Sequence, residues 1–164
     1  MNNDTYTKGQ LWVLVLLRLL IGWHFLYEGI VKLWNTNWSA AGYLVDSKGW
    51  FAKMFAAMAS NPDTVKVIDV LNVWSLILVG LGLLTGFLMR PAIIGGIVLL
   101  LFYYLSHPPL IGYTFAMPSE GSYLIVNKNL IEAAALAILY VFPTSHIIGM
   151  DRILAGWFKK PATA

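Results

Sequence analysis

One apolar segment of this chain carries ionisable residues at positions that a membrane-spanning helix would place inside the bilayer. The segment covers residues 11–34 and is long enough to span, because about 20 apolar residues cross the hydrocarbon core. Its ionisable residues are Arg18, His24, Glu28 and Lys32. Charged groups at such a depth are costly and mark function or topology. We therefore expect a membrane helix whose charged residues have a role.

The composition is typical of a membrane protein and not of a soluble domain. Hydrophobic residues make up 59% of the chain and charged residues 12%, with a mean hydropathy of +0.69, whereas about a quarter of the residues in soluble domains are charged. The length suits one membrane domain, residues 1–164. The absence of cysteine excludes disulfides, iron–sulfur clusters and thiolate metal sites. We predict no metal site and no nucleic-acid partner.

The apolar runs and their turn residues predict an all-α membrane protein, a bundle of four transmembrane helices. The predicted spans are about residues 11–34, 65–85, 91–106 and 122–142. Pro91 suits the first position of a helix, and Pro108 and Pro143 end the helices before them. Glycines of the second and third spans would let these two helices approach closely.

Two further apolar segments are too short to cross a bilayer. Residues 50–59 lie in the first long loop, and residues 146–160 form the C-terminal tail. Both have apolar residues at helical spacing, which is typical of helices that lie along the membrane interface. We predict interfacial helices there.

Four spans would put both termini and the turn at residues 86–90 on one side of the membrane, and the two long loops on the other. Short segments on the first side carry Lys8, Arg90, Arg152, Lys159 and Lys160. The long loops carry fewer basic residues relative to their length. The positive-inside rule therefore predicts a multi-pass protein of the cell (inner) membrane with both termini in the cytoplasm.

Most polar residues of the predicted spans fall in the half of the membrane next to the long loops. They are His24, Glu28, Lys32, Asp69, Asn72, Tyr103, Tyr104, His107, Lys128, Asn129 and Glu132. His24, Glu28 and Lys32 follow i,i+4 spacing and so share one face of a helix. Tyr103, Tyr104 and His107 are expected to share a face of the third span. We predict one common cavity, in which Glu28 pairs with Lys32, and Glu132 pairs with Lys128 or Lys32.

Two sets of residues resemble the DoxX/DoxD family of membrane proteins. The first-span set is Arg18, Gly22, Phe25, Leu26, Gly29, Lys32 and Leu33. The second set is Gly82-Leu83-Leu84-Thr85 with Arg90 and Ala92, followed later by Asn129-Leu130. The likeness covers roughly residues 12–142 and implies a four-helix protein of quinone-linked redox chemistry. The best-described relatives are subunits of an archaeal thiosulfate:quinone oxidoreductase. Of the candidate residues, the resemblance selects Arg18, Gly29, Lys32, Arg90 and Asn129.

Quinone chemistry fits the candidate residues on physical grounds. A quinone headgroup needs an apolar slot with aromatic walls, donors to its carbonyls and a group that passes protons. We predict a catalytic set of Glu28, His24 and Lys32, with Glu28 or His24 as the proton relay. The predicted binding residues are Trp23, Tyr27, Tyr103, Tyr104, His107, Lys128, Asn129 and Glu132. Arg18, Gly29 and Arg90 are assigned to structure or topology.

The predicted cofactor is ubiquinone or menaquinone, and the predicted partners follow from what the chain lacks. It has no flavin motif or cluster ligands, so electrons would come from an extracytoplasmic or second membrane redox subunit, or directly from a bound substrate. The lipid bilayer and further copies of the chain are the other expected partners.

Three alternatives stay open. The protein could be a non-catalytic membrane anchor or assembly partner of an extracytoplasmic redox enzyme. It could bind haem b between His24 and His107. A small transporter would need several copies to enclose a pore. Plainer roles are snorkelling for Lys32 and Arg90, and a hydrogen-bonded core position for His24.

Overall fold

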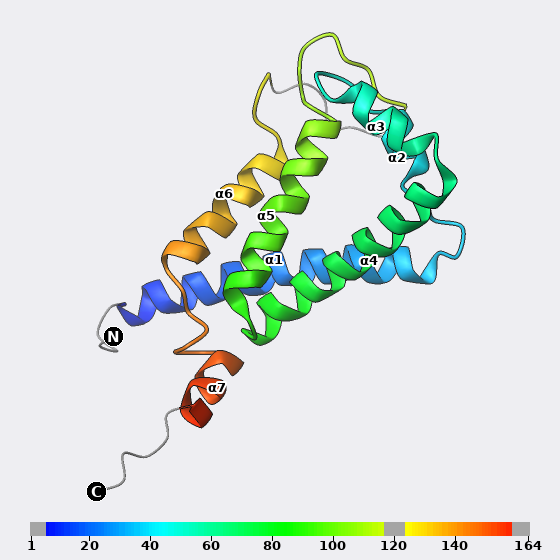
Figure 1. Ribbon diagram of the computed structural model, residues 1–164. Helices are drawn as coiled ribbons and strands as arrows, with labels where there is room; N and C mark the ends of the chain where they lie inside the picture. The colour runs from blue at the N-terminus through cyan, green and yellow to red at the C-terminus, as the bar shows by residue number, and fades with distance from the viewer. Residues whose placement is uncertain (1–5, 117–123, 159–164) are drawn as a thin grey trace, which may run out of the picture.

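A computed structural model describes residues 6–116 and 124–158, and within these ranges every regular element is an α-helix. Three helices are long and apolar enough to cross a membrane: α1 (Lys8–Trp34), α4 (Pro62–Thr85) and α5 (Met89–Ser106). These confirm the first three predicted spans with small shifts of their ends. The bundle has a loop-side end, where α1 ends and α4 begins, and a terminus-side end, where α1 begins and α4 turns into α5 (Figure 1).

Side-chain caps fix where the helices start. The Thr7 hydroxyl accepts a hydrogen bond from the backbone N–H of Gln10, and the Gln10 side chain accepts one from the Thr7 N–H, which forms a capping box at the start of α1. The Asn61 side chain caps α4 by accepting hydrogen bonds from the backbone N–H groups of Asp63 and Thr64. Gly86 ends α4 with a positive φ of 66°, a conformation that favours glycine.

The predicted start of the fourth helix is wrong. Helix α6 (Lys128–Val141) has 14 residues and begins at Lys128 rather than near residue 122. Residues 124–127 are not helical, because Leu124 has a positive φ of 68° and the Asn127 side chain caps Leu130 N. Residues 122 and 123 lie outside the described ranges. Helix α6 is about 21 Å long, shorter than the hydrocarbon core of about 30 Å.

The four long helices do not contact one another equally. Helix α1 packs closely on α4, α4 on α5 and α5 on α6, whereas α1 and α6 have few contacts. We call this sparse boundary between α1 and α6 the seam. The bundle core contains Phe25, Leu83, Ile93 and Leu136, one from each helix.

A close approach of α1 and α4 depends on glycine. A Cβ atom added at Gly80 would lie 2.5 Å from the backbone nitrogen of Leu26, and one added at Gly29 would lie 2.7 Å from the side chain of Ile77. Backbone atoms cannot move aside for a methyl group without separating the helices. Small residues therefore set the distance between these two spans.

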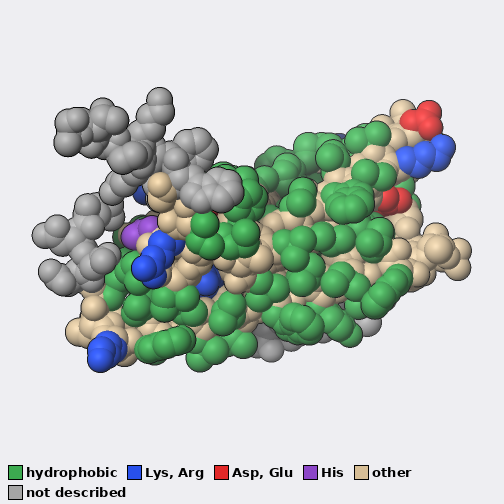
Figure 2. Space-filling model, turned by 90° about the horizontal axis from the view of Figure 1, so that it is seen from below, with side chains coloured by type: hydrophobic (Ala, Val, Ile, Leu, Met, Phe, Trp, Pro, Cys, Tyr) green, Lys and Arg blue, Asp and Glu red, His purple; other side chains and the backbone are tan. Residues whose placement is uncertain are grey.

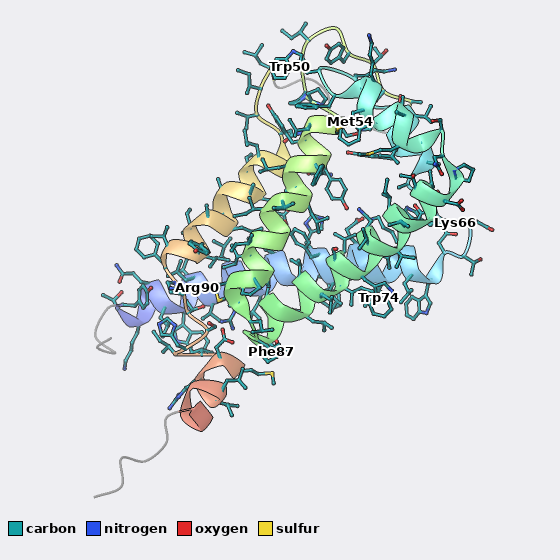
Figure 3. The ribbon with its side chains drawn as sticks, viewed as in Figure 1. Trp50, Met54, Lys66, Trp74, Phe87 and Arg90 are labelled. Atoms are coloured by element: carbon teal, nitrogen blue, oxygen red, sulfur yellow. The ribbon has the colours of Figure 1, made fainter. Side chains whose placement is uncertain are left out.

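Two short helices, α2 (Ala41–Val45) and α3 (Ala52–Ala59), cover the loop-side end (Figure 1). Leu44 and Phe55 form a small apolar cluster there with Ala40. Figure 3 shows Trp50 and Met54 at this end, and Phe87 and Arg90 at the other. The segment predicted at 50–59 is thus helical over Ala52–Ala59, and its position in a membrane stays a prediction.

The tail forms helix α7 (Met150–Phe158) at the terminus-side end (Figure 1). It begins at Met150, later than the predicted residue 146, and residues 159 and 160 lie outside the described ranges. Over the face seen in Figure 2, hydrophobic side chains cover most of the surface, and charged side chains gather mainly toward the two ends. Together with the three long apolar helices, this surface indicates a lipid bilayer environment.

Candidate functional site

His24 on α1 and Glu132 on α6 meet across the seam. The Nδ1 atom of His24 lies 2.8 Å from Oε1 of Glu132. The His24 side chain is 48% exposed, whereas that of Glu132 is 13% exposed. Glu132 was predicted to pair with Lys128 or Lys32, and its observed partner is His24. The reason is depth: Glu132 lies one turn into α6, level with His24, and Lys32 is already bonded to Glu28 on its own helix.

The predicted pairing of Glu28 with Lys32 is confirmed. The Lys32 ammonium donates to the Glu28 carboxylate, one turn away on α1, and lies 5.7 Å from the centre of the Trp38 ring. Lys128 is within electrostatic range of both Glu28 and His24. The structure therefore gathers two carboxylates, one imidazole and two ammonium groups at the seam, with members from both α1 and α6. We call these five residues the seam cluster: His24, Glu28, Lys32, Lys128 and Glu132.

Two predicted binding residues lie outside the bundle. Trp23 is 60% exposed and Tyr27 is 55% exposed, and their ring centres lie 6.3 Å apart on the outer face of α1. Both rings therefore face away from the packed core of the bundle, and their role in binding a quinone stays a prediction. The buried face of α1 is centred on Phe25 and Gly29, and Trp23 lies about 200° around the helix from Phe25.

The polar residues at the end of α5 face two directions. The Asn72 amide donates to the Tyr103 hydroxyl at 2.6 Å, and the Tyr104 hydroxyl donates to the carbonyl of Ile125 at 2.8 Å. Tyr103 and His107 both face α2, where their ring centres lie 6.0 Å and 3.9 Å from that of Tyr43. The predicted single cavity is therefore replaced by the seam cluster and a separate group around His107. Asn129 is partly buried near the start of α6.

His107 lies between two aromatic rings. Its ring centre is 3.9 Å from that of Tyr43 and 4.5 Å from that of Phe115. Its Nδ1 lies 3.0 Å from the Ser106 hydroxyl, and its Nε2 lies 3.6 Å from a carboxylate oxygen of Asp46. Burial lowers the pKa of His107, and the attraction of Asp46 only partly opposes it. Burial raises the pKa of the Tyr43 hydroxyl, because it disfavours the charged form, which for tyrosine is the deprotonated one.

No sequence pattern points to Tyr43, Asp46 or Phe115, since each lies in a loop or short helix and none belongs to a motif. Their positions also bear on the haem alternative. His24 bonds to Glu132 across the seam, and His107 is held between Tyr43 and Phe115, so the two imidazoles have different surroundings. This arrangement disfavours a haem held between them.

Arg18 and Arg90 lie apart from the seam cluster, at the terminus-side end. Arg18 is 2% exposed, and its Nη1 donates to the Thr144 hydroxyl at 3.0 Å and to the Ile148 carbonyl at 2.8 Å. The Arg90 guanidinium lies 5.9 Å from the centre of the Tyr140 ring. Both arginines thus join the helix segments that meet at this end.

Asp151 at the start of α7 fastens the same end. Its carboxylate accepts hydrogen bonds from the backbone N–H groups of Leu88 at 2.8 Å and Met89 at 3.3 Å, and from the Ser145 hydroxyl at 2.7 Å. Its own N–H donates to the Gly86 carbonyl at 2.9 Å. An acidic side chain from α7 therefore caps the start of α5.

Comparison with known proteins gives one match. No curated protein and no solved structure matches the chain. The DoxX family model matches residues 13–108, more than half of the chain, and this range takes in nearly all of α1, all of α4 and α5, and ends at Pro108. The match and the three apolar helices agree, and the chain is a multi-pass membrane protein of the DoxX family.

Proposed function

We propose that this protein is the integral membrane subunit of a quinone-linked oxidoreductase, and that it binds the quinone headgroup at the seam between α1 and α6. The observation that carries the proposal is the contact of His24 with Glu132 across the seam. Both side chains can titrate, and the His24 side chain is half exposed. The pair lies at the boundary of α1 and α6, which have fewer contacts with each other than the other neighbouring long helices have.

Access from lipid supports this location. Quinones carry isoprenoid tails and reside in the hydrocarbon, so a binding site has to open sideways to the bilayer. The His24 imidazole is exposed on the outside of the bundle, and the exposed rings of Trp23 and Tyr27 lie on the adjoining face of α1. In this proposal the two rings flank the headgroup from the lipid side.

The seam also holds groups suited to the proton chemistry. Reduction of a quinone to a quinol takes up two electrons and two protons. His24 Nδ1 and Glu132 Oε1 lie within hydrogen-bond distance of each other. Glu28 lies one turn further along α1 and pairs with Lys32. In the proposal His24 and Glu28 relay the protons, and Lys32 balances the charge of Glu28 between transfers. Electrons come from a bound substrate or from a partner subunit, as in a thiosulfate:quinone oxidoreductase.

The proposal includes a fourth span and an orientation. Leu124, Ile125 and Val126 precede α6 and are exposed and apolar, so α6 with its flanking residues supplies more apolar length than its 14 helical residues alone. With four spans, the positive-inside rule favours both termini in the cytoplasm of the inner membrane. The seam cluster then lies in the extracytoplasmic half of the bilayer.

Quinone binding tests the proposal directly. The protein is placed in nanodiscs of quinone-free lipid and titrated with ubiquinone-1 and with menadione. We expect saturable binding of one of them, weakened at least about tenfold by Glu132→Gln and by His24→Leu, because the first removes the charge that faces His24 and the second removes the hydrogen bond itself. Asp63→Asn is the matched control, since the Asp63 carboxylate is exposed and pairs with Lys66 at the start of α4.

Two results would count against the proposal. Absence of binding in the wild-type protein, together with no quinone in lipid extracts of the purified protein, would reject it and favour the non-catalytic anchor. Equal binding by wild type, Glu132→Gln and His24→Leu would show that any quinone binds elsewhere than at the seam.

A further inference from the structure

A second feature of the molecule lies at the terminus-side end, far from the seam. It is an open pocket of about 600 Å³, here called the terminal pocket, lined by Ile147, Ile148, Gly149, Arg152, Ile153 and Gly156. We propose that the terminal pocket binds an anionic phospholipid of the leaflet that faces the two termini. The acyl chain would lie against the isoleucines, and the phosphate would bind Arg152.

The floor of the terminal pocket is firmly attached to the bundle. The Ile148 carbonyl accepts a hydrogen bond from the buried Arg18, and the N–H groups of Ile147 and Ile148 donate to the Thr144 carbonyl. The N–H of Asp151 donates to Gly86 in the turn between α4 and α5. The pocket is therefore held in a fixed position relative to the membrane-spanning helices.

Arg152 is the charged residue of the pocket lining, and its guanidinium is largely uncommitted. It is exposed, and its Nη1 donates a long hydrogen bond of 3.5 Å to the Ile147 carbonyl. Over residues 6–116 and 124–158 it forms no ion pair, and the neighbouring Asp151 carboxylate already accepts from Leu88, Met89 and Ser145. A guanidinium with free donors is well suited to a phosphate group.

The position of the pocket favours a lipid over a dissolved anion. Helix α4 ends at Thr85 and α5 begins at Met89, so this end of the bundle marks the level at which the apolar spans meet the headgroups. The remaining lining is aliphatic or glycine, and Ile153 is exposed. A free phosphate would use Arg152 alone, whereas a phospholipid also covers the isoleucines.

Native mass spectrometry of the purified protein with added lipid tests the proposal. Phosphatidylglycerol and phosphatidylcholine with identical acyl chains are compared at equal concentration. One arginine near a charged membrane surface corresponds to roughly a fivefold preference for the anionic lipid. We expect that preference in the wild-type protein and its loss in Arg152→Gln. Lys8→Gln, a change of the same charge at the same end of the molecule, should keep it.

A second variant separates lipid binding from a loss of folding. A Cβ atom added at Gly156 meets no atom within 4 Å, so Gly156→Phe can be accommodated at its Cβ, adds an aromatic ring to the pocket lining and leaves Arg152 in place. We expect the retained phosphatidylglycerol to fall about fivefold with unchanged thermal stability, and glycerol phosphate at millimolar concentration to displace none of it. Equal retention of both lipids by the wild type, an unchanged preference in Arg152→Gln, or full displacement by glycerol phosphate would overturn the proposal. None of these results depends on quinone binding.

Discussion

The two ends of the bundle hold their charged residues in different ways. At the terminus-side end, Arg18 is almost fully buried and Asp151 is bonded mainly to backbone groups, so each has one fixed set of partners. At the loop-side end, His24 and Glu28 are half exposed and bond to side chains that can themselves change protonation. Partners without a titratable proton fix a structure, whereas titratable partners can exchange protons. The first end is therefore structural, and the second is the place to look for chemistry.

The largest expected effect is at Arg18. Arg18→Met removes both hydrogen bonds of the guanidinium and leaves the buried Thr144 and Ile148 groups without their donor. We expect a loss of about 2–3 kcal/mol in the free energy of unfolding, because hydrogen bonds to charged groups are the stronger class. Thermal unfolding in nanodiscs, with Lys8→Met as the control, measures it. A loss as small as that of the control would mean that Arg18 does not fasten this end.

Asp151 comes next. Asp151→Ala removes the cap on the first N–H groups of α5 and should cost about 1 kcal/mol, the usual worth of an N-cap. Hydrogen exchange should become faster at the amides of Leu88 and Met89 and stay unchanged at the start of α4. Unchanged exchange at both sites would contradict the role of Asp151.

At the loop-side end, the loss of one charged side chain should lower the free energy of unfolding by a smaller amount. Glu132→Gln removes the charge that faces His24, and because that pair is partly exposed we expect a loss below about 1 kcal/mol. Exchange of the two residues, His24→Glu with Glu132→His, should restore most of the loss in a double-mutant cycle. A cost equal to that of Arg18→Met would remove the distinction between the two ends.

The smallest expected effect is the pH dependence due to His107. Its pKa in the folded protein lies below the ordinary value of 6.5, so between these two values the unfolded chain binds more protons than the folded one. Stability should therefore fall as the pH drops below about 6.5, and rise again as the pH returns. His107→Gln should show a shallower slope of unfolding midpoint against pH over that window. A slope identical to wild type would place the pH dependence elsewhere.

Local patterns in the sequence predicted much of this structure. The three long spans follow from apolar length, and the pair of Glu28 with Lys32 follows from i,i+4 spacing on one helix. The start of α6 could not be read in the same way. Residues 124–126 are as apolar as the helix itself, and only the backbone at Leu124 and the cap at Asn127 exclude them from it.

Contacts between distant segments account for what the sequence missed. His24 meets Glu132 because α6 begins where it does and packs on α5, which no spacing within α1 reveals. The outward position of Trp23 and Tyr27 follows from which face of α1 packs on α4, and that face is set by the glycines at the α1–α4 contact. The stack of His107 with Tyr43 and Phe115 joins two loops, whose packing has no periodic signal.

The unequal lengths of α1 and α6 have a consequence for the membrane itself. With 27 and 14 residues the two helices are about 40 Å and 21 Å long, and a hydrocarbon layer of about 30 Å matches neither. Lipid beside a short apolar helix thins locally to meet it. Because α6 borders the seam, thinning would bring headgroups and water closest to Glu132. Under the proposed function, bilayer thickness would then control how readily protons reach the seam.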